Sequence, residues 1–466
     1  MKQILAVCTL AVIGGSCGGG EKATTPTHTN DAEGMNVVVL TLDTLRSDAL
    51  GCYGNPDQHT PAIDALAARG TVFQKAMSPI ATTFPSHASM FTSLYPRAHG
   101  VRWNGDSLAE DYLTLAEILD GKGYDTGAFV SYKAMVTKGG MDQGFDRRSD
   151  IEVPRGAEGI RSGAEVNELA FAYLDDLGGN AEQGTFLWLH YFEPHSPYPL
   201  TDYADANMGD YTGPLRDGAT LEEFFDLNKK ENRHADHYAA LDALYHGRVR
   251  DCDALVGEVV AGLEQRGMLD NTILVLIGDH GQLLGEHDRV GHGSILWQDA
   301  LDVPFVIVDP RSPKHFDVET RVNILDMMPT LLELLELEAP DGLQGRSLTD
   351  AMRGEEVPNQ LVFAEVRIAD PRQARPKGQR DAVAVYHEQF KFQLEGDKVK
   401  LYDLVADPGE TIRVSLSKQK ELVEQLRPFA ERHREMNPEA ARSAGEVSEE
   451  MLAELESLGY AGGDED

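Results

Sequence analysis

A run of β-branched residues at 36–42 (NVVVLTL) constrains the fold of this chain more than any other segment. The run is apolar along almost its whole length, which is typical of a strand that is buried on both faces of a parallel sheet. The next pattern along the chain is helical, and it begins at Thr60-Pro61 and ends at Gly70. A buried strand followed by a helix indicates an α/β fold.

The same alternation continues as far as residue 335. Further helices are expected at residues 112–119, 164–177, 239–265 and 324–335, and further strands at 126–130, 185–191, 272–277 and 303–308. This order predicts a mostly parallel sheet with helices on its faces, in a domain that spans residues 35–354.

The alternation of predicted strands and helices ends in the C-terminal part, residues 355–466. Short strands at 362–364, 382–386, 390–394 and 399–402 predict a small antiparallel sheet, and amphipathic helices are expected at 419–436 and 446–458.

The first residues have the pattern of an export signal. Lys2 precedes a short apolar run, and small residues lead to Cys17. The pattern resembles a bacterial lipoprotein signal, although Gly14 stands where that motif usually has Leu. We therefore predict a signal peptide at 1–16, a flexible tether at 17–34, and export to the periplasm or cell surface with a lipid anchor on Cys17. Ordinary secretion and a buried first helix are the alternatives.

Charge and cysteine content exclude several classes of protein. Lys and Arg number 42 against 77 Asp and Glu, so the net charge is −35, and binding of nucleic acid by a basic face is not expected. Four cysteines in 466 residues exclude a disulfide scaffold. If Cys17 is lipidated, Cys52 and Cys252 remain as a candidate pair, which spacing alone does not decide. No apolar run is long enough for a helix that spans a membrane.

Polar side chains follow the predicted strands, where ligands of open α/β sheets bind. Asp43 comes after the first strand, and Asp279-His280 comes after the strand at 272–277. Carboxylates suit hard cations and imidazole suits Zn²⁺ or Mn²⁺, so the three residues are a candidate site for a divalent metal. Because an Asp at a strand end often forms a turn or caps a helix, that alternative stays open for Asp43.

Thr83 lies at the predicted start of a helix, just before a proline. It is either a simple N-cap or a nucleophile, because a helix N-terminus favours anions and a bound metal favours an alkoxide. His195 and His292 are candidates to hydrogen-bond an anionic ester or to protonate its departing oxygen, or they are simply structural or exposed histidines. Asn104 and Lys133 are a neutral donor and a cation for anionic oxygens, or simply surface residues.

Motifs follow one another in a fixed order over most of the chain. They are residues 42–48 (LDTLRSD), 51–54 (GCYG), 60–67 (TPAIDALA), 84–89 (FPSHAS), 95–101 (YPRAHGV), 194–198 (PHSPY), 279–281 (DHG), 284–287 (LGEH), 343–347 (LQGRS), 401–404 (LYDL) and 407–408 (DP). This series resembles the sulfatase branch of the alkaline phosphatase superfamily. The resemblance implies an α/β sandwich with a large mixed, mostly parallel sheet and a small C-terminal antiparallel sheet domain.

The resemblance also implies roles for the candidate residues. The predicted catalytic residues are Thr83, His195 and His292, the predicted substrate-binding residues are Asn104, Lys133 and His87, and the predicted metal ligands are Asp43, Asp279 and His280.

Three departures from the family pattern bear on mechanism. Sulfatases usually carry Cys or Ser in a C/S-x-P-S/A-R motif and oxidise it to formylglycine, whereas here the segment is Thr83 to His87 (TFPSH). Thr44 replaces the second Asp of many sulfatases, so one ligand is lost. Where many members have a Gly-Lys-x-His segment that binds sulfate, this chain has residues 130–133 (VSYK), and only Lys133 is available to stand in as a cation.

These departures favour phosphate over sulfate. A formylglycine hydrate releases its sulfate by collapsing to the aldehyde, whereas a threonine adduct must be cleaved by a second in-line attack of water. Hydroxyl nucleophiles of this kind resemble those of alkaline phosphatases, phosphodiesterases and lipoteichoic acid synthases, which work on phosphate. Alternatively, Thr83 is only a metal ligand and a metal-bound water attacks the ester.

The sequence therefore predicts a hydrolase of sulfate or phosphate esters with one divalent metal ion, either Ca or Mg, or Mn or Zn. A phosphodiesterase or phosphoglycerol-type transferase is one alternative, and an inactive, surface-tethered binding protein is another. The expected partner is a small-molecule or glycan ester, and contact with the membrane is expected only through the lipid anchor. The acidic and aromatic segment at 202–232 is a candidate insertion over the site.

Overall fold

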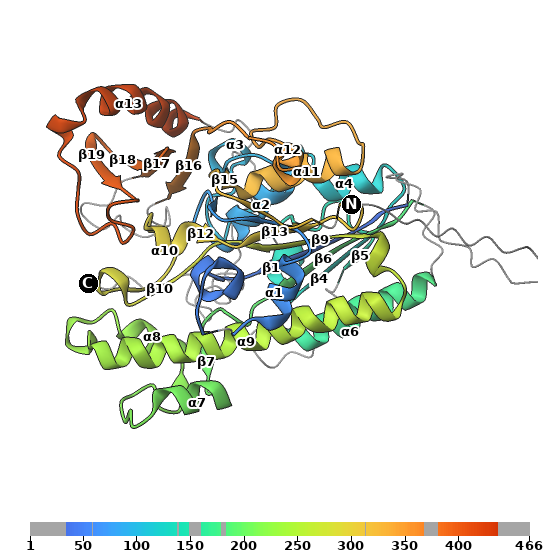
Figure 1. Ribbon diagram of the computed structural model, residues 1–466, viewed down its shortest axis with the longest axis horizontal. Helices are drawn as coiled ribbons and strands as arrows, with labels where there is room; N and C mark the ends of the chain where they lie inside the picture. The colour runs from blue at the N-terminus through green and yellow to red at the C-terminus, as the bar shows by residue number, and fades with distance from the viewer. Residues whose placement is uncertain are drawn as a thin grey trace, which may run out of the picture. The chain divides into compact units, whose positions relative to one another are not determined.

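The computed structural model describes residues 34–57, 59–137, 139–148, 160–178, 183–312, 314–367 and 381–436. Its centre is a sheet of eight strands in the order β14-β2-β13-β9-β1-β6-β4-β5 (Figure 1). The strands are β1 (Asn36–Leu42), β2 (Thr71–Phe73), β4 (Asp125–Val130), β5 (Arg147–Arg148), β6 (Thr185–Tyr191), β9 (Thr272–Gly278), β13 (Phe305–Val308) and β14 (Phe316–Val318). Only β13 runs antiparallel to its neighbours, β9 and β2, so the expected mixed, mostly parallel sheet is confirmed.

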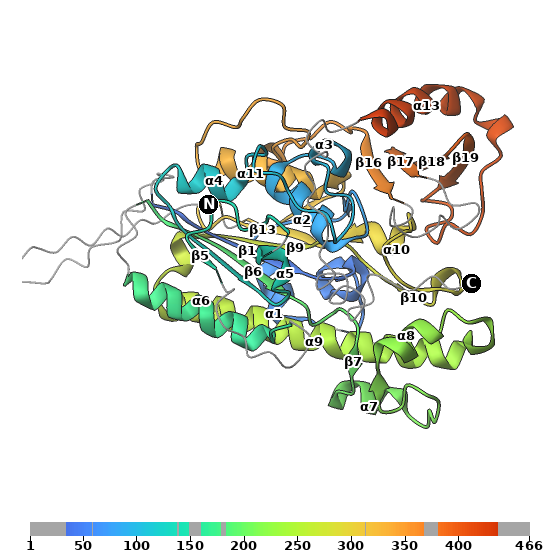
Figure 2. The same ribbon diagram turned by 180° about the vertical axis from the view of Figure 1, so that it is seen from behind.

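Helices cover both faces of this sheet (Figures 1 and 2). They are α2 (Thr83–Thr92), α4 (Leu115–Asp120) and α11 (Met327–Leu334) on one face, and α1 (Pro61–Ala67), α6 (Gly163–Leu177) and α9 (Ala235–Gln265) on the other. Because successive side chains of a strand point to opposite faces, Val37 and Val39 of β1 pack under the first set and Val38 and Leu40 under the second. The sheet is therefore the middle layer of three.

Some helices and strands begin or end at other residues than expected, because capping side chains or proline determine where they end. Thr114 forms a capping box with Glu117, so α4 begins at residue 115 rather than 112. The strand expected at 303–308 is interrupted at Pro304, which has no N–H to donate, and it becomes β12 (Asp302–Val303) and β13. A 3-10 turn over Ile324–Asp326 precedes α11.

The C-terminal elements form the expected small antiparallel sheet. Its strands are β16 (Val362–Val366), β17 (Ala382–His387), β18 (Phe390–Glu395) and β19 (Lys398–Asp403), in that order. Helix α13 (Lys420–Glu435) packs on this sheet through Leu426 and Ala430. The proposed boundary near residue 355 stays a prediction, and the helix expected at 446–458 lies outside the described residues.

A buried ionic cluster joins the small sheet to the rest of the chain. Glu365 of β16 is fully buried, and it contacts Arg102 (2.7 Å), Arg97 (3.5 Å) and His433 of α13 (3.0 Å). Burial alone would raise the pKa of Glu365, but the hydrogen bond from His433 and the charges of the two arginines outweigh it and lower the pKa to about 2.

We expect Glu365→Gln to lower the free energy of unfolding by about 3 kcal/mol at pH 7, because the folded state stabilises the ionised carboxylate more than the unfolded state does. This stabilisation is complete above the unfolded pKa near 4.5 and is lost as the pH falls toward 2. Urea unfolding between pH 7 and pH 3 measures it. The matched control is Glu395→Gln, which removes a surface ion pair with Lys400 and should cost less than about 1 kcal/mol. An equal effect of the two substitutions at every pH would contradict this account.

Two other expectations can be compared with the described residues. None of the helices in the described part of the chain is long and apolar enough to cross a membrane. Cys52 and Cys252 are free thiols, so the disulfide that the sequence left open is not formed between them. The predicted signal peptide, the tether up to residue 33 and Cys17 lie outside the described residues.

Candidate active site

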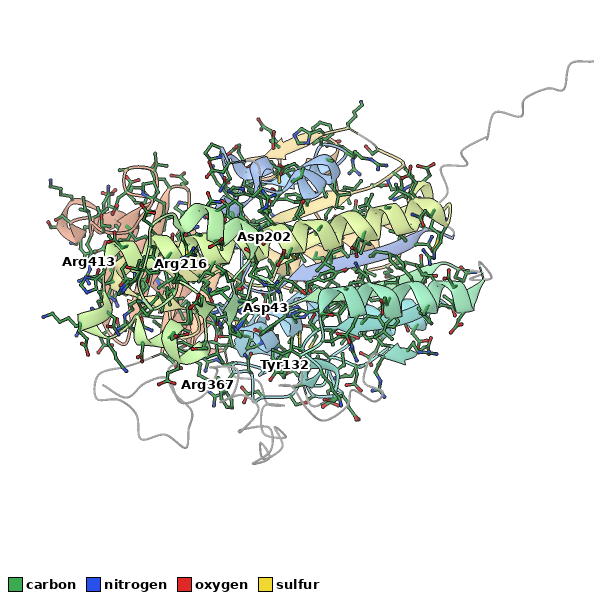
Figure 3. The ribbon with its side chains drawn as sticks, turned by 90° about the horizontal axis from the view of Figure 1, so that it is seen from below. Asp43, Tyr132, Asp202, Arg216, Arg367 and Arg413 are labelled. Carbon is green, nitrogen blue, oxygen red and sulfur yellow. The ribbon has the colours of Figure 1, made fainter. Side chains whose placement is uncertain are left out.

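Four fully buried polar residues meet beyond the carboxyl ends of β1 and β9. Asp43 follows β1, Asp279 and His280 follow β9, and Thr83 is the first residue of α2. Thr83 Oγ1 lies 3.4 Å from Asp43 Oδ2 and 3.3 Å from His280 Nε2. His280 Nε2 lies 3.5 Å from Asp279 Oδ2 and 3.9 Å from Asp43 Oδ1. Figure 3 shows Asp43 well separated from Arg413 of the C-terminal part.

Backbone geometry after β1 holds Asp279 in place. Thr44 has a left-handed conformation (φ 55°), which is uncommon for a β-branched residue and strained. In this conformation its N–H donates to Asp279 Oδ1 (3.1 Å), which also accepts from the N–H of His280 (2.6 Å). The Tyr245 hydroxyl donates to the Thr44 carbonyl (3.0 Å). Thr44 therefore orients a carboxylate through its backbone.

The orientation of His280 is set by the glycine that follows it. A Cβ atom on Gly281 would lie 2.2 Å from the carbonyl oxygen of Asp299, so only glycine fits there. The Gly281 carbonyl accepts a hydrogen bond from His280 Nδ1 (2.9 Å). Because a carbonyl only accepts, Nδ1 carries the proton and Nε2 presents its lone pair to the two carboxylates.

The electrostatics of this buried cluster favour the binding of a cation. Burial raises the pKa of Asp43 well above its usual range, and burial together with the charge of Asp43 does the same for Asp279. Burial lowers the pKa of His280 well below its usual range. Asp43 Oδ1 and Asp279 Oδ2 have no hydrogen-bond partner among the described residues. One oxygen or nitrogen from each of these three residues lies within 4.8 Å of the others, so the set fits a divalent metal ion.

Thr83 is not the simple N-cap that the sequence left open. Thr82 occupies the cap position, because the residue before the first helical one has extended backbone angles (φ −152°, ψ 131°). The hydroxyl of Thr83 is consequently directed at Asp43 and His280 and not at the helix backbone. The helix N-terminus is instead closed by Asn104, whose Oδ1 accepts from the N–H of Phe84 (2.9 Å).

Two predicted substrate-binding residues lie beside Thr83. Asn104 is fully buried, and its Nδ2 has no hydrogen-bond partner among the described residues, so it has N–H groups available for an anion. His87, one turn along α2, donates from Nδ1 to the Thr83 carbonyl (2.8 Å) and lies 3.8 Å from Asp279 Oδ2. Burial and the neighbouring His190 lower its pKa well below the usual range. A neutral His87 therefore occupies the place of the arginine of the sulfatase motif.

The two remaining predicted catalytic residues form a pair. The Nε2 atoms of His195 and His292 are 3.2 Å apart. Their Nδ1 atoms donate to the carbonyls of Ser196 and of Ala81 (3.2 Å), respectively. The ring centroid of His292 lies 4.4 Å from that of His280, so the pair adjoins the four-residue cluster. Burial lowers the pKa of His292 to about 4.

Among the described residues, no hydrogen bond links the side chain of Lys133 to the cluster. It follows β4, and its carbonyl accepts from the Thr137 hydroxyl (3.2 Å). Its side chain forms no ion pair with any other described residue. Its role in binding substrate stays a prediction.

His190 is a residue of this site to which the sequence assigned no role. It is the last but one residue of β6, it is fully buried, and its Nε2 lies 3.5 Å from Asp43 Oδ2. The available signal was a histidine near the end of an otherwise apolar strand. The segment at 202–232 borders the site less directly: Asn228 Oδ1 accepts from the N–H of Val290, two residues before His292.

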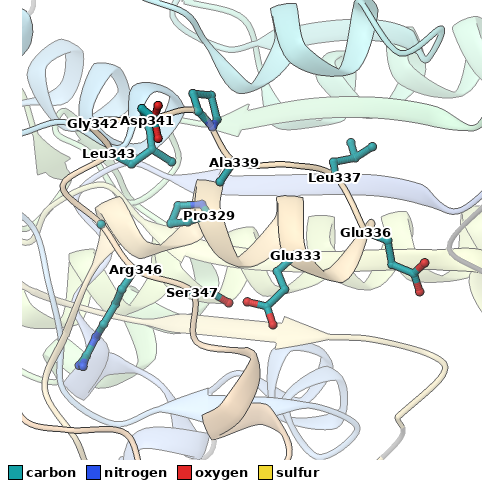
Figure 4. A pocket seen from close by; sticks show the side chains of 12 residues that line it. Pro329, Glu333, Glu336, Leu337, Ala339, Asp341, Gly342, Leu343, Arg346 and Ser347 are labelled. Carbon is teal, nitrogen blue, oxygen red and sulfur yellow. The ribbon is translucent and has the colours of Figure 1, made fainter.

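A surface pocket lies elsewhere on the molecule, along α11 and the loop that follows it (Figure 4). Glu333, Asp341 and Arg346 are among the residues that line it, and none of the clustered residues does. The candidate active site is therefore the buried cluster and not this pocket.

Family models match most of the chain. Residues 35–337 match the model described as sulfatase, and residues 285–435 match the C-terminal model of N-sulphoglucosamine sulphohydrolase. The chain belongs to the sulfatase family. The predicted α/β sandwich of the alkaline phosphatase superfamily and the predicted ester hydrolase are thereby confirmed.

This sulfatase-family chain is similar to known sulfatases and to a known phosphonate monoester hydrolase. An ulvan-active sulfatase of Formosa agariphila is 24% identical over 420 residues, covering 83% of this chain and 78% of the relative. An arylsulfatase of Clostridium perfringens is 25% identical over 384 residues, covering 68% and 78%. The crystal structure of a phosphonate monoester hydrolase of Agrobacterium radiobacter superimposes with a TM-score of 0.69 at 20% identity, covering 86% and 95%.

Proposed function

We propose that this enzyme cleaves sulfate or phosphate esters at a single divalent cation, with Asp43, Asp279 and His280 as ligands and Thr83 as the nucleophile. The observation that supports the proposal most is the position of Thr83 Oγ1, within 3.4 Å of Asp43 and His280 at the start of α2. A cation bound there would favour the alkoxide of Thr83 and offset the charge of the ester.

The residues of this chain suit an in-line displacement. Thr83 Oγ1 donates its hydrogen bond to Asp43 Oδ2, so a proton acceptor lies beside the nucleophile. The oxygen attacks sulfur or phosphorus, the ester oxygen leaves, and a threonine ester forms. Asn104 Nδ2 and the N-terminal end of α2 hold the anionic oxygens. Water then attacks the same sulfur or phosphorus atom and releases Thr83.

His195 and His292 are suited to protonate the leaving oxygen. Because both Nδ1 atoms donate to carbonyls, the 3.2 Å contact between the two Nε2 atoms needs one additional proton. Burial disfavours that proton in the free enzyme, since it lowers the pKa of His292 to about 4. An anionic ester beside the pair offsets this cost, and the shared proton then passes to the departing oxygen.

A nucleophile at Thr83 favours phosphate esters over sulfate esters as substrates, whereas the known relatives are consistent with either class. The relative from Formosa agariphila is a sulfatase, and the structural neighbour from Agrobacterium radiobacter is a phosphonate monoester hydrolase. The test is the initial rate of the chain from Gly18 to Asp466 on 4-nitrophenyl sulfate and on 4-nitrophenyl phosphate mono- and diesters, with Ca²⁺, Mg²⁺, Mn²⁺ or Zn²⁺. We expect turnover of at least one of these esters, and we expect a chelator to abolish it. Turnover that is unchanged by the chelator would contradict the proposal, and absence of turnover on any ester would favour the inactive binding protein.

We also propose that the protein is exported and held on a membrane by a lipid on Cys17. The support is the order of a basic residue, a short apolar run and small residues before that cysteine. Several acyl chains on one cysteine bind a bilayer firmly, since each buried methylene contributes about 0.8 kcal/mol. Cys17→Ala should therefore move the expressed protein from the membrane fraction to the soluble fraction. Continued sedimentation with membranes would exclude the lipid anchor.

A further inference from the structure

The left-handed backbone of Thr44 is not held in place by the hydroxyl group of that residue. Thr44 is fully buried, and its Oγ1 has no hydrogen-bond partner among the described residues. A β-branched residue in this conformation is strained, and such strain persists only where the surrounding structure enforces it. Other groups must therefore keep the loop after β1 in the shape that lets the N–H of Thr44 reach Asp279 Oδ1.

The hydroxyl of Tyr245 on α9 bridges two backbone groups of this loop. It donates to the carbonyl of Thr44 (3.0 Å) and accepts from the N–H of Arg46 (2.9 Å). Both loop residues are buried, and a buried backbone group that loses its partner is unfavourable. One side chain of a distant element therefore fixes the chain on both sides of Leu45.

Tyr245 is itself well placed to act as a fixed point. It is fully buried and belongs to the apolar core between the sheet and α9, a helix of 31 residues. Its ring meets that of Tyr198 at 86°, with the centroids 6.3 Å apart. Close packing of this kind restricts the direction in which the hydroxyl points.

We propose that Tyr245 is a positioning residue of the cation site. Its hydroxyl holds the left-handed backbone of Thr44, the N–H of Thr44 holds Asp279 Oδ1, and Asp279 Oδ2 is thereby directed at the cation. This inference rests on the cation site of the proposed function. Groups that orient a metal ligand in this way contribute to metal affinity without touching the metal.

The test measures metal binding directly, with the metals alone as probes. Wild-type chain and Tyr245→Phe are stripped with a chelator, and their affinities for Mn²⁺, Zn²⁺ and Ca²⁺ are measured by isothermal titration calorimetry. Circular dichroism confirms that each variant is folded. The matched control is Tyr53→Phe, because the Tyr53 hydroxyl also bridges two backbone groups, the N–H of Phe305 in β13 (2.7 Å) and the carbonyl of Phe73 in β2 (3.2 Å).

A second pair of variants tests whether Tyr245 acts through the backbone of Thr44. Glycine adopts a positive φ at no steric cost, so the loop of Thr44→Gly needs less support from Tyr245. The affinities of Thr44→Gly and of the double variant Thr44→Gly/Tyr245→Phe complete a double-mutant cycle with the first two proteins.

Tyr245→Phe should weaken the binding of each metal that the wild type binds by about 10- to 100-fold. Tyr53→Phe should bind these metals within about twofold of the wild type, because its partners lie in other strands. In the Thr44→Gly background, removal of the Tyr245 hydroxyl should weaken binding by less than about threefold.

Wild-type affinity in folded Tyr245→Phe would overturn this inference and leave the proposed function standing. An equal loss of affinity with and without Thr44→Gly would also overturn it, because the hydroxyl would then not act through the Thr44 backbone. If the wild type binds none of the three metals, the cation site of the proposed function is overturned together with this inference.

Discussion

Asp279→Ala should abolish metal binding and reduce kcat/KM by roughly a thousand-fold, which corresponds to about 4 kcal/mol of lost transition-state stabilisation. The reason lies in the two different environments of its oxygens. Oδ1 accepts from the N–H groups of Thr44 and His280, and Oδ2 faces the candidate cation site without a partner. The substitution therefore removes a ligand and the anchor of the loop beside it.

Two variants separate these contributions. Asp279→Asn keeps an oxygen for the two N–H groups but loses the charge, so it should fold normally and bind metal poorly. Asp309→Asn is the control for loss of a buried carboxylate, since Asp309 pairs with Arg311 away from the cluster. Metal content by mass spectrometry and kcat/KM are measured on all three variants. Full turnover by Asp279→Ala would contradict the single-cation site.

The second large effect is expected at Thr83. Thr83→Ala should lower kcat by about 10³- to 10⁴-fold with little change in KM, because the hydroxyl acts on the reacting atom and not in ground-state binding. Thr83→Ser restores the hydroxyl and should recover activity to within about tenfold of the wild type.

Stability provides the control for this pair. Thr82, and not Thr83, is the N-cap of α2, so removal of the Thr83 hydroxyl should change the unfolding free energy by less than about 1 kcal/mol. Urea unfolding checks that expectation. If Thr83→Ala keeps at least a tenth of the wild-type kcat while it remains folded, a water molecule attacks the ester and Thr83 is at most a ligand.

Much of the fold was predictable because the buried strands carry strong local signals. β1, β6 and β9 are apolar runs that are buried at every residue, and polar residues directly after β1 and β9 had to meet at one edge of a parallel sheet. This reasoning made Asp43 and Asp279 candidates, but a turn or cap remained an alternative for Asp43 until the family motifs were considered. The family motifs were needed for Thr83, whose place at the start of a helix has more than one explanation in the sequence.

The rest depended on contacts between distant segments. His190 belongs to the strand expected at 185–191, and the register of β6 with β1 brings it to Asp43. The pairing of His195 with His292 joins residues that are 97 positions apart. The groups that lower the pKa of Glu365 likewise come from two distant segments, Arg97 and Arg102 from one and His433 of α13 from the other. Periodicity carries no information about such contacts, because it reports only which face of an element is buried.

In the mechanism that we propose, Thr83 becomes covalently attached to the sulfuryl or phosphoryl group during turnover. The most direct measurement is acid quenching of the metal-loaded enzyme during turnover of 4-nitrophenyl phosphate or 4-nitrophenyl sulfate, followed by peptide mapping by mass spectrometry. We predict a phosphothreonine or sulfothreonine at position 83, lost in Thr83→Ala. Thr83 that stays unmodified during rapid turnover would contradict this mechanism, because a direct attack of water forms no threonine ester.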